Sequence, residues 1–419
     1  MKKDAGYSIA RWTLLVAVAA VLGAGTSPVT SAQSKLGPPP PPPLPLPYYG
    51  YTLTDLGAGN SSGWSFAYAI NNLGEAVGDM TEPTGVDRAF RTQGNQPINF
   101  QGSDDLGVLS GDYRSYAWAI NNAGVAVGES LHILNFTQTR AIRSTGPTAV
   151  LEDLHTNSTG NFPTNPMLNM FGVTNTHAQG INDDGWIVGY YTDTNNHTHS
   201  LVSFGPTLTQ PIDLSWYGNP FQSATFDVNN NDQMVGWRSQ LSTNLPRAFM
   251  FDAAAGVMRT IDIGMLPGGL TSTAYSINDS AVVVGESQTS TTTHAFLFQD
   301  ANNNGFVDPG ELKDLDTVNS SQSGARSVNN HGAAVGYFGD CAGVIYCGSR
   351  AAIFSGGTVT DLNTQVRGGT GVWTLRVATG INDNGQIVGF MEDSNPDNQA
   401  RVRHAFRLDL YTPIRLPIR

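Results

Sequence analysis

The nine-residue pattern Ile/Val-Asn-x-x-Gly-x-x-Val-Gly occurs seven times along this chain of 419 residues, and it constrains the fold more than any other feature. The copies are spaced 47 to 61 residues apart and begin at Ile70, Ile120, Ile181, Val228, Ile277, Val328 and Ile381. A period of this length is typical of repeated supersecondary units, each of which needs its neighbours to bury its apolar face. The sequence therefore predicts a repeat fold, and the repeated residues are expected first of all to build it.

The first block of each repeat predicts a β-hairpin. Apolar and polar residues alternate on both sides of the segment Asn-x-x-Gly, as in residues 67–71 and 75–78. Asn favours the opening of a type I turn, and Gly favours the left-handed position that follows it. Asp232 and Ala281 stand where the other five repeats have Gly. Asp tolerates a positive φ angle and Ala does so poorly, so we expect the turn at Ala281 to differ from the others.

Two further blocks follow each hairpin. The second is a basic residue before a small and an apolar one, and its basic members are Arg88, Arg140, His199, Arg247, His294, Arg350 and His404. The third is Asp before a branched apolar residue, and it begins at Asp105, Asp153, Asp213, Asp262, Asp314 and Asp361. Each repeat thus provides four short strands in a meander, and such sheets repeated around an axis form a β-propeller. We predict an all-β fold of this type.

The two ends of the chain indicate how the ring closes. Seven hairpins and seven strands of the second block are present, but only six strands of the third block follow them. A seventh copy, Asp55-Leu56, lies near the N-terminus, whereas Asp409-Leu410 follows its repeat too closely to be that copy. The sequence therefore predicts a seven-bladed propeller of four-stranded blades, in which the N-terminal strand completes the last blade and removes an exposed edge.

The first 47 residues are expected to lie outside this fold. Lys2, Lys3 and Arg11 precede an apolar run over residues 12–23, which is too short to cross a bilayer, and the small residues 30–32 provide a cleavage site. We expect residues 1–32 to be a secretory signal peptide, 33–47 a proline-rich linker of polyproline structure, and 48–419 the propeller. The protein is thus predicted to reach the periplasm or the extracellular space.

The charge of the chain argues against two classes of partner. Only 13% of the residues are charged, and the formal net charge is −12. The predicted signal peptide carries three positive charges and the negative charge of Asp4, so its loss removes +2 and leaves −14. An acidic surface without a run of basic residues repels nucleic acid and anionic lipid. We therefore expect no nucleic-acid partner. No segment after residue 23 is apolar enough to cross a bilayer, so we expect no membrane span. We also expect the protein to be a monomer.

The repeat resembles the HAF repeat of bacterial extracellular proteins, which is named for its His-Ala-Phe strand. The resemblance rests on Ile277-Asn278, Val284-Gly285, His294-Ala295-Phe296 and Asp314-Leu315, and it covers residues 52–408. It implies a secreted repeat protein. Members of this family have no assigned activity, so the resemblance implies no catalytic residues.

One segment matches a calcium-binding loop. Residues 300–311 satisfy the pattern D-x-[DN]-x-[DN]-G-x5-E in full. The expected ligands are side-chain oxygens and one main-chain carbonyl, from Asp300, Asn302, Asn304, Phe306 (the carbonyl), Asp308 and Glu311. Strands are expected on both sides of the loop, so we predict a structural Ca2+ site in a hairpin of the fifth blade. The alternative is a polar turn that binds no metal.

The cysteines and histidines give weaker signals. Cys341 and Cys347 lie six residues apart, and such a pair in an exported chain is expected to form a disulfide, with a redox-active or metal-binding pair as the alternative. His177, His197 and His199 could hold a metal. No acidic or sulfur ligand recurs at a suitable spacing, so surface histidines are the preferred interpretation.

Residues that break the repeat are the better candidates for ligand binding. Two irregular segments are expected on one rim, the insertion 155–177 and the loop 341–347, and the apolar residues expected to contact a ligand there are Phe162, Met167, Met170 and Phe171. The seven basic residues of the second block could form a ring that attracts anions. Their occurrence in every repeat instead favours pairing with the recurring Asp of the same blade.

These observations favour a binding module for a protein or glycan ligand, with no catalytic residues indicated. The alternative is a calcium-dependent carbohydrate-active enzyme on the same scaffold, which requires two carboxylates, or a His and a carboxylate, at one rim. Asp79, Glu129, Asp193 and Glu286 are acidic residues of that rim, but the sequence provides no reason to pair them. A purely structural role in the cell envelope is the third possibility.

Overall fold

The structure is a computed structural model of the chain. It describes residues 50–58, 63–99, 102–132, 139–145, 150–154, 175–203, 212–213, 222–240, 243–253, 259–318, 320, 322–339, 348–393 and 402–411. The predicted signal peptide and linker lie outside the described residues. So do several residues of the predicted sites, namely Phe162, Met167, Met170, Phe171, Cys341 and Cys347.

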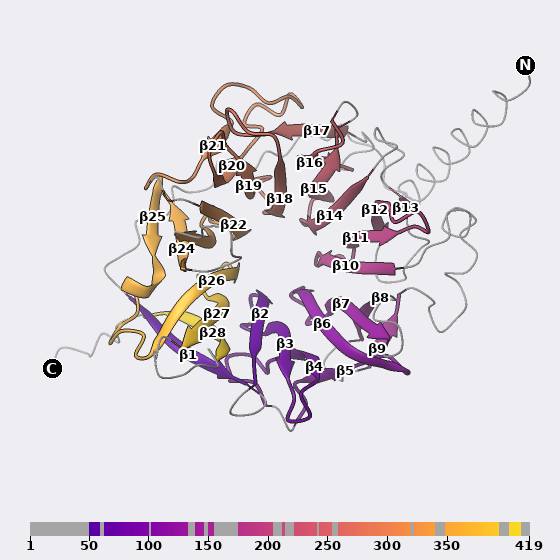
Figure 1. Cartoon of the computed structure of the whole chain (residues 1–419), viewed down its shortest axis with the longest axis vertical. Helices are drawn as coiled ribbons and strands as arrows, with labels where there is room; N and C mark the ends of the chain where they lie inside the picture. The colour runs from indigo at the N-terminus through magenta and orange to yellow at the C-terminus, as the bar shows by residue number, and fades with distance from the viewer. Residues whose placement is uncertain are drawn as a thin grey trace, which may run out of the picture.

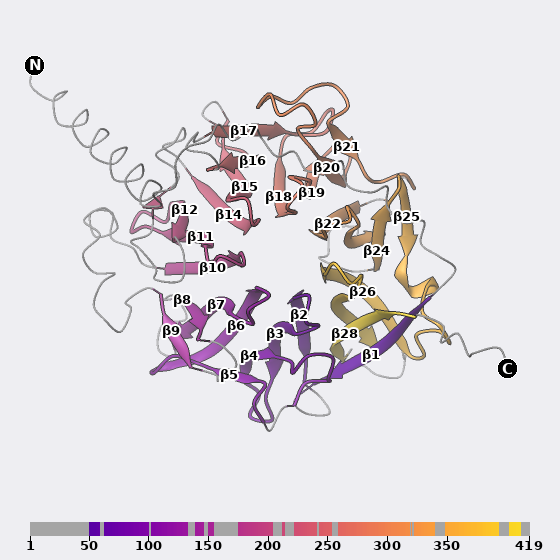
Figure 2. The same ribbon diagram turned by 180° about the vertical axis from the view of Figure 1, so that it is seen from behind.

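The described chain is built of β-strands, which form antiparallel four-stranded groups placed side by side around one axis (Figure 1). Figure 2 shows the same arrangement from behind. Each group begins with a strand next to the axis and proceeds outward strand by strand. The predicted all-β, propeller-type fold is therefore confirmed.

The first three groups follow the chain in order. Group 1 contains β2 (Ser65–Ile70), β3 (Ala76–Thr81), β4 (Asp87–Arg91) and β5 (Asp105–Gly107). Group 2 contains β6 (Asp112–Ile120), β7 (Ala126–His132), β8 (Thr139–Ser144) and β9 (Leu151–Asp153). Group 3 contains β10 (Asn175–Ile181), β11 (Ile187–Thr192), β12 (Thr198–Ser203) and β13 (Ile212–Asp213).

The next three groups repeat this pattern. Group 4 contains β14 (Ser223–Val228), β15 (Gln233–Ser239), β16 (Pro246–Asp252) and β17 (Arg259–Gly264). Group 5 contains β18 (Ser272–Ile277), β19 (Val283–Gln288), β20 (Thr293–Phe298) and β21 (Leu312–Asp314). Group 6 contains β22 (Gln322–Val328), β23 (Ala334–Gly339), β24 (Ser349–Ser355) and β25 (Thr358–Asp361), followed by the 3-10 helix η3 (Leu362–Thr364). A single parallel pair, Thr293 with Gln322, joins groups 5 and 6 into one sheet.

Group 7 combines the two ends of the chain. Its strands are β26 (Trp373–Ile381), β27 (Ile387–Asp393) and β28 (Arg403–Leu410), and its outer strand is β1 (Tyr51–Gly57). β1 pairs antiparallel with β28, from Tyr51 opposite Leu410 to Gly57 opposite Ala405. Asp409 lies within β28 and is not part of a separate strand, as the spacing predicts.

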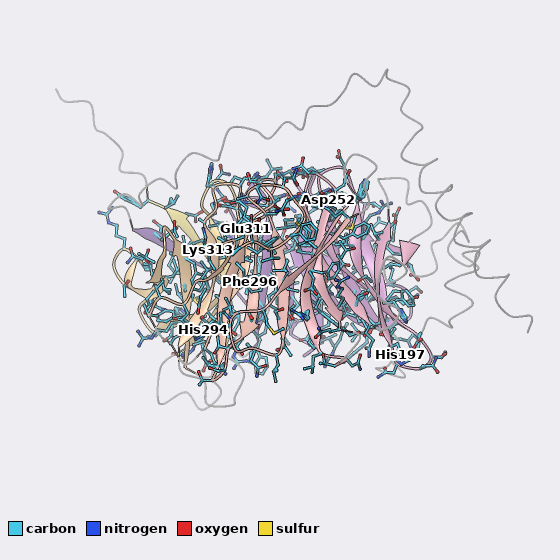
Figure 3. The ribbon with its side chains drawn as sticks, turned by 90° about the horizontal axis from the view of Figure 1, so that it is seen from above. His197, Asp252, His294, Phe296, Glu311 and Lys313 are labelled. Carbon is cyan, nitrogen blue, oxygen red and sulfur yellow. The ribbon has the colours of Figure 1, made fainter. Side chains whose placement is uncertain are left out.

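The molecule has two faces, which we name by their connections. The turn face carries the Asn-x-x-Gly turns and the connections from third to fourth strands. The loop face carries the connections from second to third strands and from one group to the next. Figure 3 shows Asp252 and Glu311 on the turn face and His197 and His294 on the loop face. No helix in the described part of the chain has the length and apolar character needed to cross a bilayer.

The apolar core lies between neighbouring groups. Val77, Ala89 and Leu106 of group 1 pack in one cluster with Ala117 and Ile120 of group 2. Equivalent clusters join each later pair of groups, and one joins Val388 and Ala405 of group 7 to residues of group 1. Each group therefore buries its apolar side chains only when the next group is in place.

The recurring Val-Gly dipeptide is explained by a β-bulge. In every group the first strand shifts register two residues before its final Ile or Val, as between Ala117 and Ala119. The bulge brings a carbonyl of the first strand over the Gly of the second. A Cβ added to Gly128 would lie 1.9 Å from the carbonyl oxygen of Tyr116. The six equivalent glycines meet the same obstacle at 1.8–2.0 Å, so only Gly fits.

The turn at Ala281 does not differ from the others, so that prediction is wrong. Ala281 adopts a φ of 56°, and Asp232 adopts 61°, in the left-handed region that Gly occupies elsewhere. The main-chain NH of Ala281 donates to the carbonyl of Asn278 at 3.0 Å, as the equivalent Gly residues do. The side chain of Asn278 also accepts from the NH groups of Ser280 and Val282. These bonds offset the roughly 1–2 kcal/mol that a left-handed Ala costs.

Candidate functional site

A polar pocket of about 160 Å³ lies on the axis at the turn face. The first three residues of every repeat pattern line it, from Ile70, Asn71 and Asn72 in group 1 to Ile381, Asn382 and Asp383 in group 7. The seven inner strands end here, so the same residues of each repeat meet around one point.

The first Asn of the pattern forms a ring of hydrogen bonds. Its Oδ1 accepts main-chain NH groups of its own turn, as Asn71 does from Leu73 and Glu75. Its Nδ2 donates to the main-chain carbonyl of the equivalent Asn in the next group. These seven bonds measure 2.8–3.1 Å and run through Asn71, Asn121, Asn182, Asn229, Asn278, Asn329 and Asn382 back to Asn71. We call this set the Asn ring.

The following residue forms a second ring beside the first. Its main-chain NH donates to the side-chain oxygen of its counterpart in the next group at 2.8–2.9 Å, through Asn72, Asn122, Asp183, Asn230, Asp279, Asn330 and Asp383. The three carboxylates also accept from amide groups of neighbouring Asn residues. The polar groups of the pocket thus satisfy one another, which explains why the pattern recurs in every repeat.

In six of the seven groups, a Ser or Thr that the sequence patterns above do not include lies five residues before the first residue of the repeat pattern, here called the anchor. Its hydroxyl accepts the main-chain NH of the small residue in the second block of the preceding group, at 2.8–3.2 Å. Ser115, for example, accepts from Ala89. The residues are Ser65, Ser115, Thr176, Ser223, Ser272 and Ser323, and group 7 has Arg376 there. Their constant distance from the anchor is the signal that could have revealed them.

Residues that differ between repeats gather farther along the first two strands. The position after Val-Gly holds Asp79, Glu129, Tyr190, Trp237, Glu286, Tyr337 and Phe390. We call this set the belt. The second strands that carry it stand next to the inner strands around the axis (Figure 1). The belt residues contact side chains of the inner strands, within a group and across to the next one, as follows.

Glu129 and His177 form one of these contacts. The Nδ1 atom of His177, on β10, is hydrogen-bonded to the Oε2 atom of Glu129, on β7. The two side chains are 16% and 12% exposed. The His177 ring also stacks on Tyr190, with centroids 4.3 Å apart. A carboxylate at Nδ1 fixes the orientation of the ring and leaves Nε2 available for another partner.

Glu286 forms a second contact, between groups 5 and 6. It accepts from the guanidinium of Arg326 at 2.7 Å and from the hydroxyl of Tyr337 at 2.8 Å. Arg326 lies over the ring of Tyr275, 4.2 Å from its centroid. The ion pair of Glu286 with Arg326 thus links groups 5 and 6, and the cation–π contact of Arg326 with Tyr275 adds to it.

Asp79 forms a third contact, within group 1. The hydroxyl of Tyr68 donates to Asp79 Oδ1 at 2.6 Å. Burial raises the pKa of Asp79 to about 7, although the hydrogen bond from Tyr68 opposes the rise. Burial, together with the charge of Asp79, also raises the pKa of the Tyr68 phenol well above its usual value. Asp79 can therefore hold a proton near neutral pH, which an ordinary surface carboxyl does not.

Asp193 is the fourth acidic residue of the loop face, and it meets two histidines. Its Oδ2 atom lies 3.5 Å from His197 Nδ1 and 3.5 Å from His199 Nε2. No sequence pattern paired the four acidic residues, and the structure indeed places each with a different partner. No three His, Cys, Asp or Glu side chains among the described residues are placed to hold one metal ion.

The basic residues of the second block pair mainly with the recurring Asp, as predicted. The contacts in five groups are Arg140–Asp153 at 2.8 Å, Arg247–Asp262 at 3.5 Å, His294–Asp314 at 2.8 Å, Arg350–Asp361 at 3.0 Å and His404–Asp55 at 2.9 Å. In the last pair the Asp comes from β1. Arg88 lies near Glu82 and His199 near Asp193 instead. Each of the seven basic residues thus lies beside a carboxylate, and in five groups this carboxylate is the recurring Asp.

The predicted calcium loop connects β20 to β21, in the fifth group as expected. Asp300 accepts from the NH groups of Asn304 at 3.1 Å and Gly305 at 2.8 Å. Glu311 folds back over the loop and accepts from the NH groups of Ala301 and Asp308, both at 2.8 Å. The side chains of Asp300 and Glu311, the first and last expected ligands, therefore both point into the loop and hold it compact.

The oxygen atoms of this loop suit a hard cation such as Ca2+. The three carboxylates of Asp300, Asp308 and Glu311 alone are too few to fill its coordination sphere. Asn302 and Asn304 donate their amides to Asp308 Oδ2 at 2.7 and 2.8 Å. The Asn oxygens and the carbonyl of Phe306 would have to complete a coordination sphere. Arg259 of group 4 lies 3.9 Å from Asp300 Oδ2 and donates to Asn303 Oδ1 at 2.9 Å, so the loop also joins two groups.

The model of a family described as a protein of unknown function, DUF3466, matches residues 85–263. No curated protein matches the chain.

Solved structures also resemble the chain, among them the following three. The β-propeller domain of the Trilobed protease from Pyrococcus furiosus, described as having an open velcro topology, is 10% identical; 84% of this chain and 100% of that one are covered, with a TM-score of 0.48. An acylaminoacyl peptidase from Pyrococcus horikoshii is 12% identical over 65% of this chain and 42% of that one, with a TM-score of 0.38. A polysaccharide lyase of family PL25, an ulvan lyase, is 12% identical over 84% and 81%, with a TM-score of 0.29. All three TM-scores are below 0.5, so these resemblances say nothing about the function of this chain.

Proposed function

We propose that this protein is an exported β-propeller that binds an extracellular ligand, a protein or a glycan, on its loop face. The belt carries this proposal. The ring residues repeat from group to group, whereas the belt varies and combines carboxylates with aromatic rings and neighbouring His177. Variation placed on a regular scaffold is where binding specificity resides, and aromatic linings with a few polar groups are typical of ligand sites.

The scaffold of this proposal is a closed, monomeric propeller of seven four-stranded blades. Three observations support it: the seven groups of strands, the pairing of β1 with β28, and the Asn ring, which returns from Asn382 to Asn71. The core cluster that joins group 7 to group 1 also supports it. A closed ring holds the belt residues of different blades at fixed distances.

Export is the second part of the proposal. The basic and apolar residues within the first 32 support a signal peptide, and the low share of charged residues and the resemblance to HAF repeats agree with an extracellular or periplasmic location. A disulfide between Cys341 and Cys347 fits the oxidising setting that export provides. The proline-rich stretch then serves as a spacer before the propeller.

The binding proposal is tested by removing the insertion that leads into His177. A chain lacking residues 159–171 is expected to keep its melting temperature, because nine residues then join Asp153 to Thr176, as nine join Asp105 to Ser115 in the preceding pair of groups. Its sedimentation with insoluble extracellular glycans and with cell-envelope material is expected to fall at least about fivefold, since the insertion supplies apolar contact area. A chain lacking residues 134–137, from another loop of the same face, is the control. Equal sedimentation of the insertion variant and the full chain contradicts the proposed position of the site.

Calcium is the proposed structural cofactor, held by the loop 300–311. We expect excess Ca2+ to raise the melting temperature of the full chain, because a ligand present at about 100 times its Kd stabilises the folded state by about 2.7 kcal/mol. Asp300→Ala is expected to abolish the rise, since it removes a carboxylate of the loop whose side chain is only 4% exposed. The measurement is thermal unfolding with calcium and with chelator.

Phe306→Ala is the matched control for calcium. Phe306 is 72% exposed and is expected to contribute only its main-chain carbonyl, so its variant is predicted to keep the full calcium response. If calcium leaves the melting temperature of the full chain unchanged, the loop is an ordinary polar turn and the cofactor proposal is wrong.

A carbohydrate-active enzyme is the second candidate, favoured by two observations. Asp79 has a pKa of about 7, and the pair of Glu129 with His177 supplies a candidate base. Release of reducing ends from the glycans of the sedimentation experiment, lost in Asp79→Asn, would establish this candidate. Binding without release favours the module.

A further inference from the structure

Asp79 differs from the two other acidic residues of the belt. Glu129 is hydrogen-bonded to an imidazole, and Glu286 forms an ion pair with a guanidinium. Asp79 accepts from the neutral hydroxyl of Tyr68 at 2.6 Å, and no basic side chain among the described residues forms an ion pair with it. It is therefore the one acidic group of the belt without a positively charged partner.

Asp79 is also buried where groups 1 and 2 pack against each other, a region that we call the seam. The residue is only 5% exposed. Next to it, the ring of Tyr68 on β2 lies 4.4 Å from that of Trp118 on β6, so aromatic side chains fill the seam on this side. A carboxylate that is removed from water without a counter-charge is unstable, and burial therefore favours the protonated form of Asp79.

The nearest strands supply no positive charge to Asp79. The strands β2, β4 and β6 pack against β3, which carries it. β4 contributes Asp87, and the charge of Asp87 raises the pKa of Asp79 further. β6 contributes Tyr116 and Arg114, and the guanidinium of Arg114 lies 3.4 Å from Asp87 Oδ2. Arg114 thus pairs with Asp87 and leaves the charge of Asp79 uncompensated.

The two arginines of β4 are engaged elsewhere. Arg88 lies 3.7 Å from Glu82, and Arg91 donates to the main-chain carbonyl of Gly124 at 2.5 Å. Glu129 on β7 adds another negative charge on this side, which acts on Tyr68. The hydrogen bond from the Tyr68 hydroxyl is therefore the contact that favours the ionised form of Asp79.

The balance of these effects determines how stability depends on pH. Burial raises the pKa of Asp79 from its ordinary value of 3.8 to about 7. Between these two values the folded chain holds a proton that the unfolded chain has released. The free energy of unfolding therefore falls as the pH rises from about 4 to about 7, and this contribution stays constant at higher pH.

We propose that Asp79 is a proton-dependent switch in the seam between groups 1 and 2. The neutral carboxyl keeps the two groups packed in a mildly acidic medium, and its ionisation weakens the seam in a neutral or alkaline one. The switch needs no ligand, so it stands apart from the proposed binding function.

The test compares thermal unfolding of the full chain and of Asp79→Asn between a pH of about 5.5 and about 8.5. The Asn side chain imitates the neutral carboxyl and can still accept from Tyr68. The variant is expected to gain about 2–3 °C in melting temperature relative to the full chain across this range, mostly below a pH of about 7. Burial also raises the pKa of Asp227 and of Asp232 to about 6, but both residues act equally in the two proteins, so the difference isolates Asp79.

Tyr68→Phe is a second, independent test. It removes the hydrogen bond that favours the ionised form of Asp79. The melting temperature of this variant is therefore expected to level off at a higher pH than that of the full chain. This variant decides the question by itself if Asp79→Asn fails to fold.

Asp105→Asn is the matched control, because Asp105 lies on the outer strand of the same group. It accepts from the NH of Gly107 at 2.7 Å, a bond that Asn also accepts. Its melting temperature is expected to run parallel to that of the full chain at every pH. A parallel course for Asp79→Asn overturns the switch, and so does a Tyr68→Phe variant that levels off at the same or a lower pH. Neither result bears on the binding function, which the sedimentation experiment tests.

Discussion

Replacing Gly128 by Ala is expected to destabilise the fold severely. The new Cβ would lie 1.9 Å from the carbonyl oxygen of Tyr116 and 2.9 Å from Ala117 Cα, and both obstacles are main-chain atoms. Relief requires the bulge of β6 to open, and that bulge positions the residues between groups 1 and 2. We expect a loss of at least about 4 kcal/mol, in the range that marks a disrupted backbone. Urea unfolding followed by circular dichroism measures it.

Gly85→Ala is the control for this steric clash, because it tests the cost of placing Ala at a positive φ without any clash of its Cβ. Gly85 has a φ of 84°, and a Cβ there meets no atom within 4 Å. Its replacement is expected to cost only about 1–2 kcal/mol, as a left-handed non-glycine residue does. If Gly128→Ala is no more harmful than Gly85→Ala, the bulge is not the reason for the recurring Val-Gly.

Replacing Asn278 by Ala is expected to produce the second large effect. The side chain accepts from the NH groups of Ser280 and Val282 and donates to the carbonyl of Asn329 at 2.8 Å. The residue is 4% exposed, so water cannot fully replace these bonds. Each buried group left without a partner costs about 1–3 kcal/mol, so the total is expected to be about 3–5 kcal/mol. The melting temperature should fall by about 4–6 °C.

Asn195→Ala is the control, because Asn195 is exposed in a loop of group 3. Its replacement is expected to change stability by less than about 0.5 kcal/mol. A drop for Asn278→Ala no larger than that of the control would mean that the Asn ring contributes little to the cohesion of the fold.

The pattern of the fold could be predicted from the sequence because it is repeated. The hairpin, the second block and the third block each occur in every group. A pattern that occurs seven times at a similar spacing is not a chance match. The pairing of His294 with Asp314 follows from the same logic, since both residues recur at matching places. The role of Asn278 was predicted only in part. Its turn was expected, but its bond to Asn329 crosses 51 residues and joins two groups.

The candidate site could not be predicted in the same way. Glu129 and His177 lie 48 residues apart, and no other repeat combines these residue types, so no pattern revealed their contact. The contact between the rings of Tyr68 and Trp118, whose centroids lie 4.4 Å apart, likewise depends on how closely two inner strands approach. The missed Ser115 is different, because its constant spacing from the anchor was visible. Conformational propensity alone predicts a different turn at Ala281. The hydrogen bonds of Asn278 outweigh this propensity and keep Ala281 at a positive φ.

The pairing of β1 with β28 has a consequence for the order of events as the chain is made. Asp55 and His404 meet although 349 residues separate them. During translation β1 is synthesised first and β28 last, so β1 lacks its partner strand until synthesis is nearly complete. A contact between such distant residues forms slowly, because the intervening chain must first be ordered. The last sheet is therefore the final one to assemble, and a chain interrupted anywhere before residue 403 leaves β1 with an open edge that can pair with another molecule.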